Sequence, residues 1–491
     1  MGVSGGLSLE DFRLVPCVGF EDSSIRTSQA MAWFQDHLFV GTGRGPLRPM
    51  GLSPEALSEY PVLARLAARR RSRRTREQEA GAQIWRFDPV GWTWEQVYES
   101  PWVVGLDGED CPRDRSVRAR AVYQGTSDPS PALYMGIGSM EGQVVIVRSA
   151  DGESFSETDH DGLGLGDADI PSIRTLCEWR GVLHTTPVGK NHDRGLLDDI
   201  RTDHPIVFAS PDPARGAWRP VSDPGFGDDE NLSVDEMAVF GGCLYAGTHN
   251  PAQGFQVWKA SARTARGRYK WRKIITDGAH RGPESSVPVG MQAFGDALYV
   301  GSGLEEQGMG ETFASGPFGA EILRIHPDDS WDLVVGSARD TPDGRKEPLS
   351  GWGPGFDDEF VQGYRRLVEH DGWLYAGGSD WRFAPTYLPR RGHERPDLSP
   401  SRERYLRART EEWEGGFGFW RSRDGVEWTA ITTDGFDDNP YTYAIRELVP
   451  TPHGLFVATI ANRSSQFGGG LRVWVGSNGT TPSRARPRPR R

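Results

Sequence analysis

The sequence of 491 residues is poor in cysteine and lacks long apolar runs. Its four cysteines form no CxxC pair, which excludes a disulfide scaffold or a zinc knuckle. No window reaches the roughly eighteen apolar residues of a transmembrane helix. The first residues have neither a basic start nor an apolar core, so no secretory signal is expected. These absences predict a cytoplasmic protein with free thiols and no membrane partner.

The common catalytic and metal-binding motifs are also missing. There is no P-loop, no dinucleotide fingerprint after a strand, no nucleophile elbow, and no HxH or HExxH spacing among the 11 histidines. No cofactor is therefore predicted. Acidic turns such as 226–231 and 356–359 leave calcium as an alternative, but Asx turns explain them better. A net charge of −12 argues against nucleic acid as a partner.

Glycine and proline, by contrast, are abundant, with 62 and 35 residues. Helices tolerate such a content poorly, whereas an all-β chain with many turns requires it. One short strand recurs in seven copies, each with leucine, a mostly aromatic second position and a small residue before glycine or its substitute. The copies are 38–42, 133–136, 183–186 (degenerate), 244–248, 298–302, 374–377 and 455–459.

Each copy has the same neighbours in the sequence. An apolar segment and a tight turn precede it, an alternating strand follows, and a fourth strand begins with an aromatic residue. After the seventh copy the fourth strand is missing, but a matching strand lies at about 10–17. The fold class predicted is all-β: one seven-bladed β-propeller of four-stranded blades, closed by the N-terminal strand.

Two turns, Ser149-Ala150-Asp151-Gly152 and Ser422-Arg423-Asp424-Gly425, each end three residues before an aromatic residue. They resemble the Asp-box of sialidase-like propellers. The longer pattern, GFGD followed by LYAGT and a GxQVW strand, is similar to repeats of many bacterial propeller proteins. The resemblance implies a fold rather than a chemistry. It provides no catalytic residue in this chain.

The propeller is predicted to span about 8–479, followed by a disordered Pro/Arg-rich tail at 480–491. Four insertions, at about 43–82, 187–205, 303–319 and 378–416, fall between the second and third strands of their blades. Loops at this position share one face of a propeller, so we expect the functional site on that face. Two of the insertions are rich in arginine, which favours an anionic ligand.

A ring of residues is predicted near the start of the innermost strands, at equal distance from the repeated motifs. Its members are Gln29, Arg120, Arg174, Asp235, Val289, Arg365 and Arg446. Guanidinium groups that converge on the axis repel one another unless anions compensate them, and they bind carboxylate or phosphate in bidentate fashion. Hence Gln29 and the four arginines, together with Asp380 at the end of another strand, are the predicted binding residues for an anionic small molecule.

The candidate catalytic residues are Asp235 and His249. Asp235 is the only carboxylate of the ring, and beside Arg174 it suits an ion pair or a metal better than general acid catalysis. His249 follows the fourth repeat copy and is a candidate general base. The sequence favours an enzyme of lyase, hydrolase or cyclase type, for instance in specialised metabolism. A non-catalytic ligand-binding or protein-interaction scaffold is the alternative.

Overall fold

The computed structural model describes residues 5–17, 20, 22, 24–44, 81–104, 110–139, 143–159, 162–166, 168, 170–192, 196–198, 201–263, 267–304, 317–382, 399–462, 465 and 468–478. Most of the insertions at 43–82 and 303–319, part of the insertion at 378–416, and the tail at 480–491 lie outside these residues. The described part is all-β, as the glycine and proline content predicts.

Consecutive strands pair into four-stranded antiparallel meanders. The first three comprise β2 (Ile25–Phe34), β3 (His37–Arg44), β4 (Gln83–Asp88) and β5 (Thr93–Glu99); β8 (Asp114–Tyr123), β9 (Ala132–Ser139), β10 (Val145–Ser149) and β11 (Ser156–Glu157); and β12 (Ser172–Trp179), β13 (Val182–Val188), β16 (Phe208–Ser210) and β17 (Arg219–Pro220).

Further along the chain the same pairing recurs. The strands are β18 (Ser233–Phe240), β19 (Cys243–His249), β20 (Gln256–Arg263) and β21 (Tyr269–Ile275); β22 (Val287–Phe294), β23 (Ala297–Gly303), β24 (Ile322–Ile325) and β25 (Trp331–Val335); β28 (Val361–His370), β29 (Trp373–Asp380), β30 (Phe419–Ser422) and β31 (Trp428–Thr432); and β32 (Thr442–Thr451), β33 (Gly454–Ala461) and β34 (Val473–Gly476).

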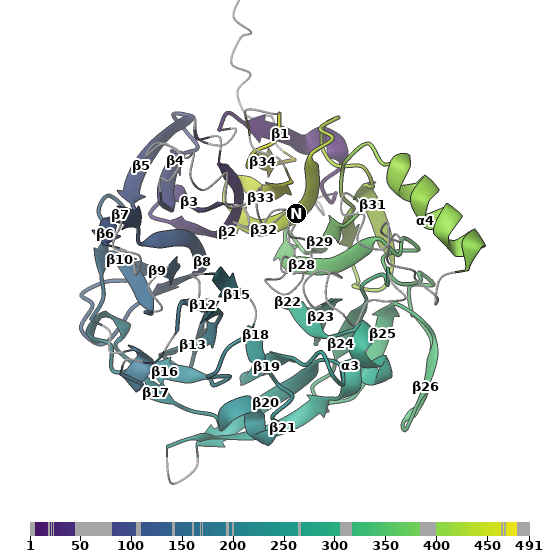
Figure 1. Cartoon of the computed structure of the whole chain (residues 1–491), viewed down its shortest axis with the longest axis horizontal. Helices are drawn as coiled ribbons and strands as arrows, with labels where there is room; N and C mark the ends of the chain where they lie inside the picture. Colours follow the sequence, from purple (N-terminus) through teal and green to yellow (C-terminus); the bar gives the residue numbers. More distant parts are fainter. Residues whose placement is uncertain are drawn as a thin grey trace, which may run out of the picture.

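The two ends of the described chain meet in one sheet. β1 (Phe12–Val15) pairs antiparallel with β34, with Phe12 opposite Gly476 and Val15 opposite Val473. The meanders are arranged around a central axis, with the first strand of each innermost, which is the arrangement of a β-propeller (Figure 1). Apolar side chains fill the space between adjacent meanders; for example, Ala30, Phe39 and Ile84 pack against Val117 and Met135.

The glycine of the repeated strand is explained by this packing. A Cβ atom built on Gly41 would lie 2.4 Å from Cβ of Val117 in the next meander. At Gly136 and Gly377 the corresponding distances, to Ile173 and Ile445, are 2.5 and 2.7 Å. The next innermost strand approaches so closely that a larger side chain would clash. The repeat therefore marks contacts between meanders as well as strand positions.

The two Ser-x-Asp-Gly turns form the same hydrogen bonds. Ser149 Oγ accepts from the Gly152 amide, and Asp151 accepts from the amides of Glu153 and Ser154. Ser422 and Asp424 repeat this pattern with the amides of residues 425, 426 and 427. These side chains are thus occupied in shaping a turn between the third and fourth strands.

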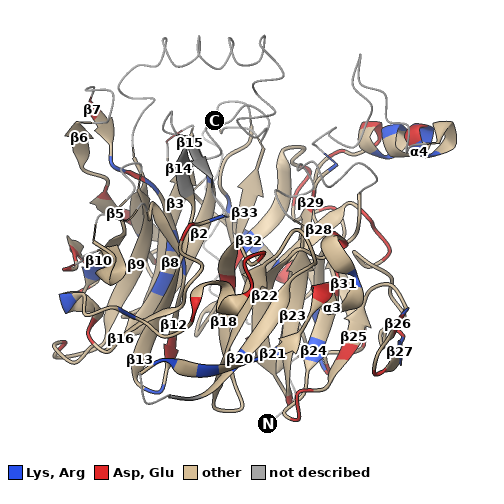
Figure 2. Ribbon diagram, turned by 60° about the horizontal axis from the view of Figure 1, so that its bottom comes forward, with Lys and Arg blue, Asp and Glu red and all other residues tan. Residues whose placement is uncertain are grey.

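The remaining described elements are short hairpins and helices outside the meanders. The short hairpins are β6 (Trp102–Val104) with β7 (Asp110–Pro112), β14 (Lys190–His192) with β15 (Leu196–Asp198), and β26 (Arg339–Thr341) with β27 (Gly344–Lys346); the helices are α3 (Asp277–His280) and α4 (Pro400–Glu411). In Figure 2, β6–β7, β14–β15 and α4 lie at the same end of the propeller. The described parts of two insertions thus lie at one end.

Docking of β1 can be tested at Val15, which is fully buried against Met31, Leu38 and Val473. Val15→Ala should lower the free energy of unfolding by about 2 kcal/mol, because it leaves a cavity between the first and last meanders. The measurement is chemical denaturation. Glu10→Gln, an exposed substitution in the same segment, is the control. Equal midpoints for both variants would show that β1 is not docked in solution.

Candidate functional site

Each innermost strand contains a β-bulge near the level at which the ring was predicted. At this level the pairing skips one residue on each strand except β12, where it skips Arg174 and Thr175; β2, β8, β28 and β32 have a second irregularity nearer their start. The residues at the bulge are Gln29, Arg118, Arg174, Asp235, Val289, Arg365 and Arg446. A bulge bends its strand and re-aims the side chains beside it. The ring is therefore a structural feature of the fold, repeated at the axis.

One member of the predicted ring is wrong. In the second meander the bulge lies at Arg118, whereas Arg120 pairs with Met135 two residues further along β8. The turn from β8 to β9 is longer than its equivalents, so the spacing that locates the other members does not apply there. The Arg118 side chain is buried, and its Cδ lies 3.3 Å from where a Cβ on Gly138 would be.

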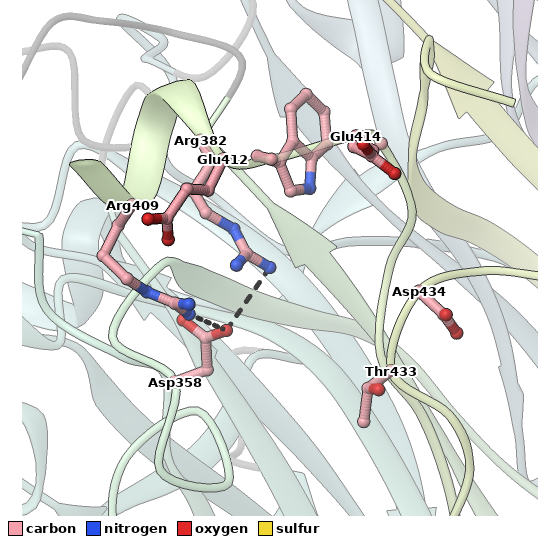
Figure 3. Close-up of a pocket in the computed structure, with 9 residues that line it drawn as sticks. Asp358, Arg382, Arg409, Glu412, Glu414, Thr433 and Asp434 are labelled. Atoms are coloured by element: carbon pink, nitrogen blue, oxygen red, sulfur yellow. Dashed lines mark hydrogen bonds and ion pairs between the residues drawn. The ribbon is translucent and has the colours of Figure 1, made fainter. Parts of the chain in front are cut away.

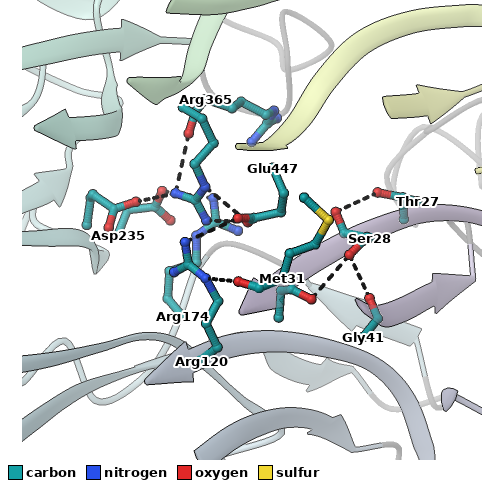
Figure 4. A network of polar contacts seen from close by, with 12 residues as sticks. Thr27, Ser28, Met31, Gly41, Arg120, Arg174, Asp235, Arg365 and Glu447 are labelled. Carbon is teal, nitrogen blue, oxygen red and sulfur yellow. Dashed lines mark hydrogen bonds and ion pairs between the residues drawn. The ribbon is translucent and has the colours of Figure 1, made fainter. Parts of the chain in front are cut away.

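Arg120 nevertheless reaches the axial cluster. Its Nε donates a hydrogen bond to the Met31 carbonyl at 2.5 Å, and its guanidinium lies 3.3 Å from Glu447 Oε2 (Figure 4). It thus crosses from β8 past β2 to β32, and joins residues of separate meanders.

Arg366 forms the centre of a buried ion-pair network. Its guanidinium donates two hydrogen bonds to Glu447 Oε1, at 2.6 and 3.0 Å, and one to Glu236 Oε2 at 3.1 Å. Glu447 is fully buried. Burial and the two carboxylates act in opposite directions on Arg366, and the net result is a raised pKa. The network links β28 to β18 and β32 across the axis, so its carboxylates are already engaged by Arg366 and Arg120.

Arg174 and Asp235 form the ion pair that the ring position suggests. Their side chains come from neighbouring innermost strands, β12 and β18, and the guanidinium lies 3.2 Å from Asp235 Oδ2. Asp235 is 2% exposed. This pair is the one place in the described part of the chain where two members of the predicted ring neutralise each other.

Arg365 and Arg446 are different. Within the described residues, neither guanidinium has a hydrogen-bonding or ion-pairing partner. Burial, with a further contribution from Arg174, lowers the pKa of Arg365 to about 10. Burial and the charges of Arg365 and Arg174 lower the pKa of Arg446 well below its usual value. Both shifts indicate positive charge that lacks compensation.

Two other predicted residues take different positions. Gln29 is half-buried at its bulge, and its Oε1 atom accepts no hydrogen bond among the described residues. His249 is fully buried at the end of β19, opposite Ser233. Its burial separates it from solvent, so a role as general base would require proton exchange through the protein.

Asp380 belongs to a second cluster, under α4. Arg382 binds both of its carboxylate oxygens and also pairs with Asp358 at 3.3 Å. Asp358 in turn pairs with Arg409 of α4 at 3.4 Å. Burial raises the pKa of Asp380 to about 6 despite the arginine. The predicted binding residue thus holds Arg382 in place, and none of its described contacts joins it to Arg365 or Arg446.

This cluster forms one wall of a cavity of about 360 Å³ (Figure 3). Figure 3 shows Arg382 and Arg409 converging on Asp358 on one side, with Thr433 and Asp434 opposite. The other lining residues are Glu412, Trp413, Glu414 and Gly415. Acidic side chains outnumber basic ones here, so this cavity suits an anion less well than the axial site.

The helix α4 is anchored to the propeller on two sides. Ser399 caps its N-terminus, and the guanidinium of Arg402 binds both carboxylate oxygens of Glu359 at 2.8 and 2.5 Å. Leu406 is fully buried against Phe360, Trp381 and Tyr443. Tyr443 lies close enough to Arg365 and Arg446 for their charges to act on its phenol. The helix therefore packs on residues that border the axial arginines.

The acidic turns and the other candidate metal ligands can be described from their geometry. Within the residues that are described, no group of three or more His, Cys, Asp or Glu side chains is arranged to hold a metal ion. In the acidic turns, Asp228 and Asp358 accept hydrogen bonds from amides two residues further on, as in Asx turns. The described helices also include none that is long and apolar enough to span a membrane.

Sequence reasoning did not identify Glu236, Arg366 or Glu447. Each directly follows a member of the predicted ring, and strict alternation would turn its side chain away from that of its neighbour. The bulge breaks the alternation, so consecutive residues both act at the axis. The charged pairs Asp235-Glu236, Arg365-Arg366 and Arg446-Glu447 at equivalent positions are the signal that could have revealed them.

Comparisons with known proteins give a distant structural likeness. No known family model matches the chain, and neither does any curated protein. A puromycin hydrolase structure is 14% identical, with a TM-score of 0.45 over 98% of this chain and 58% of its own. The GH74 xyloglucanase from Xanthomonas campestris is 15% identical, with a TM-score of 0.41 over 92% of this chain and 54% of its own.

A puromycin-hydrolyzing peptidase of Mycobacterium tuberculosis is 12% identical, with a TM-score of 0.39 over 94% of this chain and 54% of its own. The chain thus spans little more than half the length of these proteins.

The raised pKa of Asp380 gives a pH-dependent prediction. A carboxyl group with a pKa of about 4 in the unfolded chain and about 6 in the folded protein stabilises the fold when protonated. That contribution is lost as the pH rises from about 4 to about 6. Asp380→Asn cannot ionise, so its free energy of unfolding relative to the parent protein should rise over this window, by up to about 3 kcal/mol.

Chemical denaturation of both proteins between pH 4 and pH 7.5 measures this difference. Asp328→Asn is the control: hydrogen bonds from Ser330 lower the pKa of Asp328, so its difference from the parent protein should stay nearly constant above about pH 5. A difference for Asp380→Asn that is independent of pH would show that folding does not raise the pKa of this carboxyl group.

The anchoring of α4 predicts a second effect. Arg402→Gln removes the bidentate contact with Glu359, a contribution on the order of 1 kcal/mol, so hydrogen exchange in α4 should become roughly fivefold faster. Arg407→Gln is the control, because Arg407 pairs with Glu403 on the same helix. Equal exchange in the two variants would mean that the contact with Glu359 does not hold the helix.

Proposed function

We propose that the chain forms one seven-bladed β-propeller, over about residues 8–479, that binds a small organic anion at its axis. Seven repeat copies supply the second strand of seven meanders: β3, β9, β13, β19, β23, β29 and β33. The pairing of β1 with β34 supports closure of the ring. Its free cysteines support a cytoplasmic location.

The observation that carries the proposal is the uncompensated charge of Arg365 and Arg446. Arg446 is 6% exposed and Arg365 is half-buried. A guanidinium in such surroundings without a carboxylate or carbonyl partner is costly, and a bound anion would supply the missing charge. The lowered pKa values of both arginines are the signature of that cost. Guanidinium forks bind carboxylate and phosphate oxygens in bidentate fashion, so the ligand class is an anion.

The ligand would enter from the face that carries α4 and β14–β15. The bulge residues precede Glu236, Arg366 and Glu447 on strands that start at this face, so the unpaired arginines lie on the side from which a ligand approaches. The ion pairs of Arg366 form the floor beneath them. This arrangement supports a site with one entrance.

An enzymatic role is supported by Glu236 as well as by the predicted residues Asp235 and His249. Burial raises the pKa of Glu236, although Arg366 and Arg174 oppose the shift. An ionised carboxylate with a raised pKa beside a ligand site can accept a proton, as lyases, hydrolases and cyclases require. Turnover of the bound anion would separate this role from that of a non-catalytic binding or interaction scaffold.

The proposal is tested by a substitution that should stabilise the unliganded protein, although most substitutions of buried residues destabilise it. Arg446→Met should raise the free energy of unfolding of the unliganded protein by about 1–4 kcal/mol, because it removes an uncompensated buried charge. The same variant should lose the increase in melting temperature that phosphate, sulfate or citrate gives the parent protein. Both effects are measured by thermal unfolding with and without each anion.

Arg366→Met is the matched control, since that arginine is fully paired. It should lower the free energy of unfolding by about 3–5 kcal/mol, because Glu447 and Glu236 would be left without their partner. The proposal fails if Arg446→Met is as destabilising as Arg366→Met, or if anions stabilise the Arg446→Met variant as much as the parent protein.

A further inference from the structure

We infer that the ligand of the axial site carries a compact group with two negative charges, such as a phosphate monoester. This inference rests on the proposed function and refines it from any anion to one charge class. Arg174, Arg365 and Arg446 are three arginines of the predicted ring, and the charge of Arg174 contributes to lowering the pKa of the other two. Their local charge balance points to the class of ligand.

One negative charge is already present among these three. Asp235 pairs with Arg174 at 3.2 Å, and it is the carboxylate that most affects Arg365. Two positive charges remain, on Arg365 and Arg446. Since a buried site is most stable near neutrality, the ligand should bring two negative charges.

The neighbouring carboxylates do not supply this charge. Glu447 accepts hydrogen bonds from Arg366 and lies 3.3 Å from Arg120, and Glu236 pairs with Arg366. These two carboxylates are matched by two arginines. Arg118 is not among the main charges that shift the pKa of Arg365 or Arg446. The excess of two positive charges therefore remains on Arg365 and Arg446.

The origin of the side chains favours one compact group over two separate ones. Arg174 belongs to β12, whereas Arg365 and Arg446 belong to the adjacent strands β28 and β32. These two strands lie on the other side of the axis from β12 (Figure 1). Each guanidinium presents five N–H donors in a planar fork. A tetrahedral group with three terminal oxygens can accept from forks that approach from several directions, which a planar carboxylate does less well.

The test compares methyl phosphate, a dianion at pH 8, with dimethyl phosphate, a monoanion of similar shape, and with succinate, whose two charges are separated. Isothermal titration of the full chain should give methyl phosphate a dissociation constant about tenfold or more below those of the other two. Below about pH 6 methyl phosphate becomes a monoanion, and its advantage should disappear.

Variants separate this inference from the proposed function. Arg446→Gln removes one of the two excess charges, so the preference for methyl phosphate over dimethyl phosphate should fall toward one. Arg407→Gln, on the outer helix, should leave it unchanged. Equal binding of the two phosphates, or tighter binding of succinate, overturns the dianion inference while anion binding stands. If none of the three binds, the proposed function itself is wrong.

Discussion

The positive charge buried at the axis is the constraint on which the rest of the site depends. Several arginines converge where the innermost strands meet, and a low-dielectric interior does not tolerate them without partners. Three carboxylates, Asp235, Glu236 and Glu447, neutralise part of that charge through ion pairs between innermost strands. Among the described residues, Arg365 and Arg446 have no such partner. The division between a neutralised floor and a charged site above it follows from this count.

The β-bulges make this arrangement possible. In a regular strand, neighbouring side chains point to opposite faces, so each innermost strand would offer one residue per level. A bulge allows the side chains of two consecutive residues to act at the axis, as in Arg365-Arg366 and Arg446-Glu447. In the proposed site, one member of each pair would form the floor and the other would face the ligand. The repeated scaffold thus carries a site without any insertion into the innermost strands.

Much of this architecture could be predicted from sequence because it is repeated. The glycine of the repeated strand recurs for a packing reason, and Gly41 lies against Val117 as Gly377 lies against Ile445.

Equal spacing along the sequence also located most of the bulge residues. It failed at Arg120, where a longer turn shifts the count to Arg118. Glu236 and Arg366 could not be found by alternation, since a bulge is not visible in hydrophobic pattern. Asp380 was placed at the axis by analogy of strand ends, but its carboxylate is held by Arg382 under α4.

The site can be examined most simply by crystallography with selenate, a compact dianion with an anomalous signal. If the unpaired guanidiniums form the ligand site, an anomalous peak should lie between Arg174, Arg365 and Arg446, within hydrogen-bonding distance of Arg365 and Arg446. An axis without selenate, with the side chains of Arg365 and Arg446 turned onto protein carbonyls or carboxylates, would contradict the proposed role of these arginines.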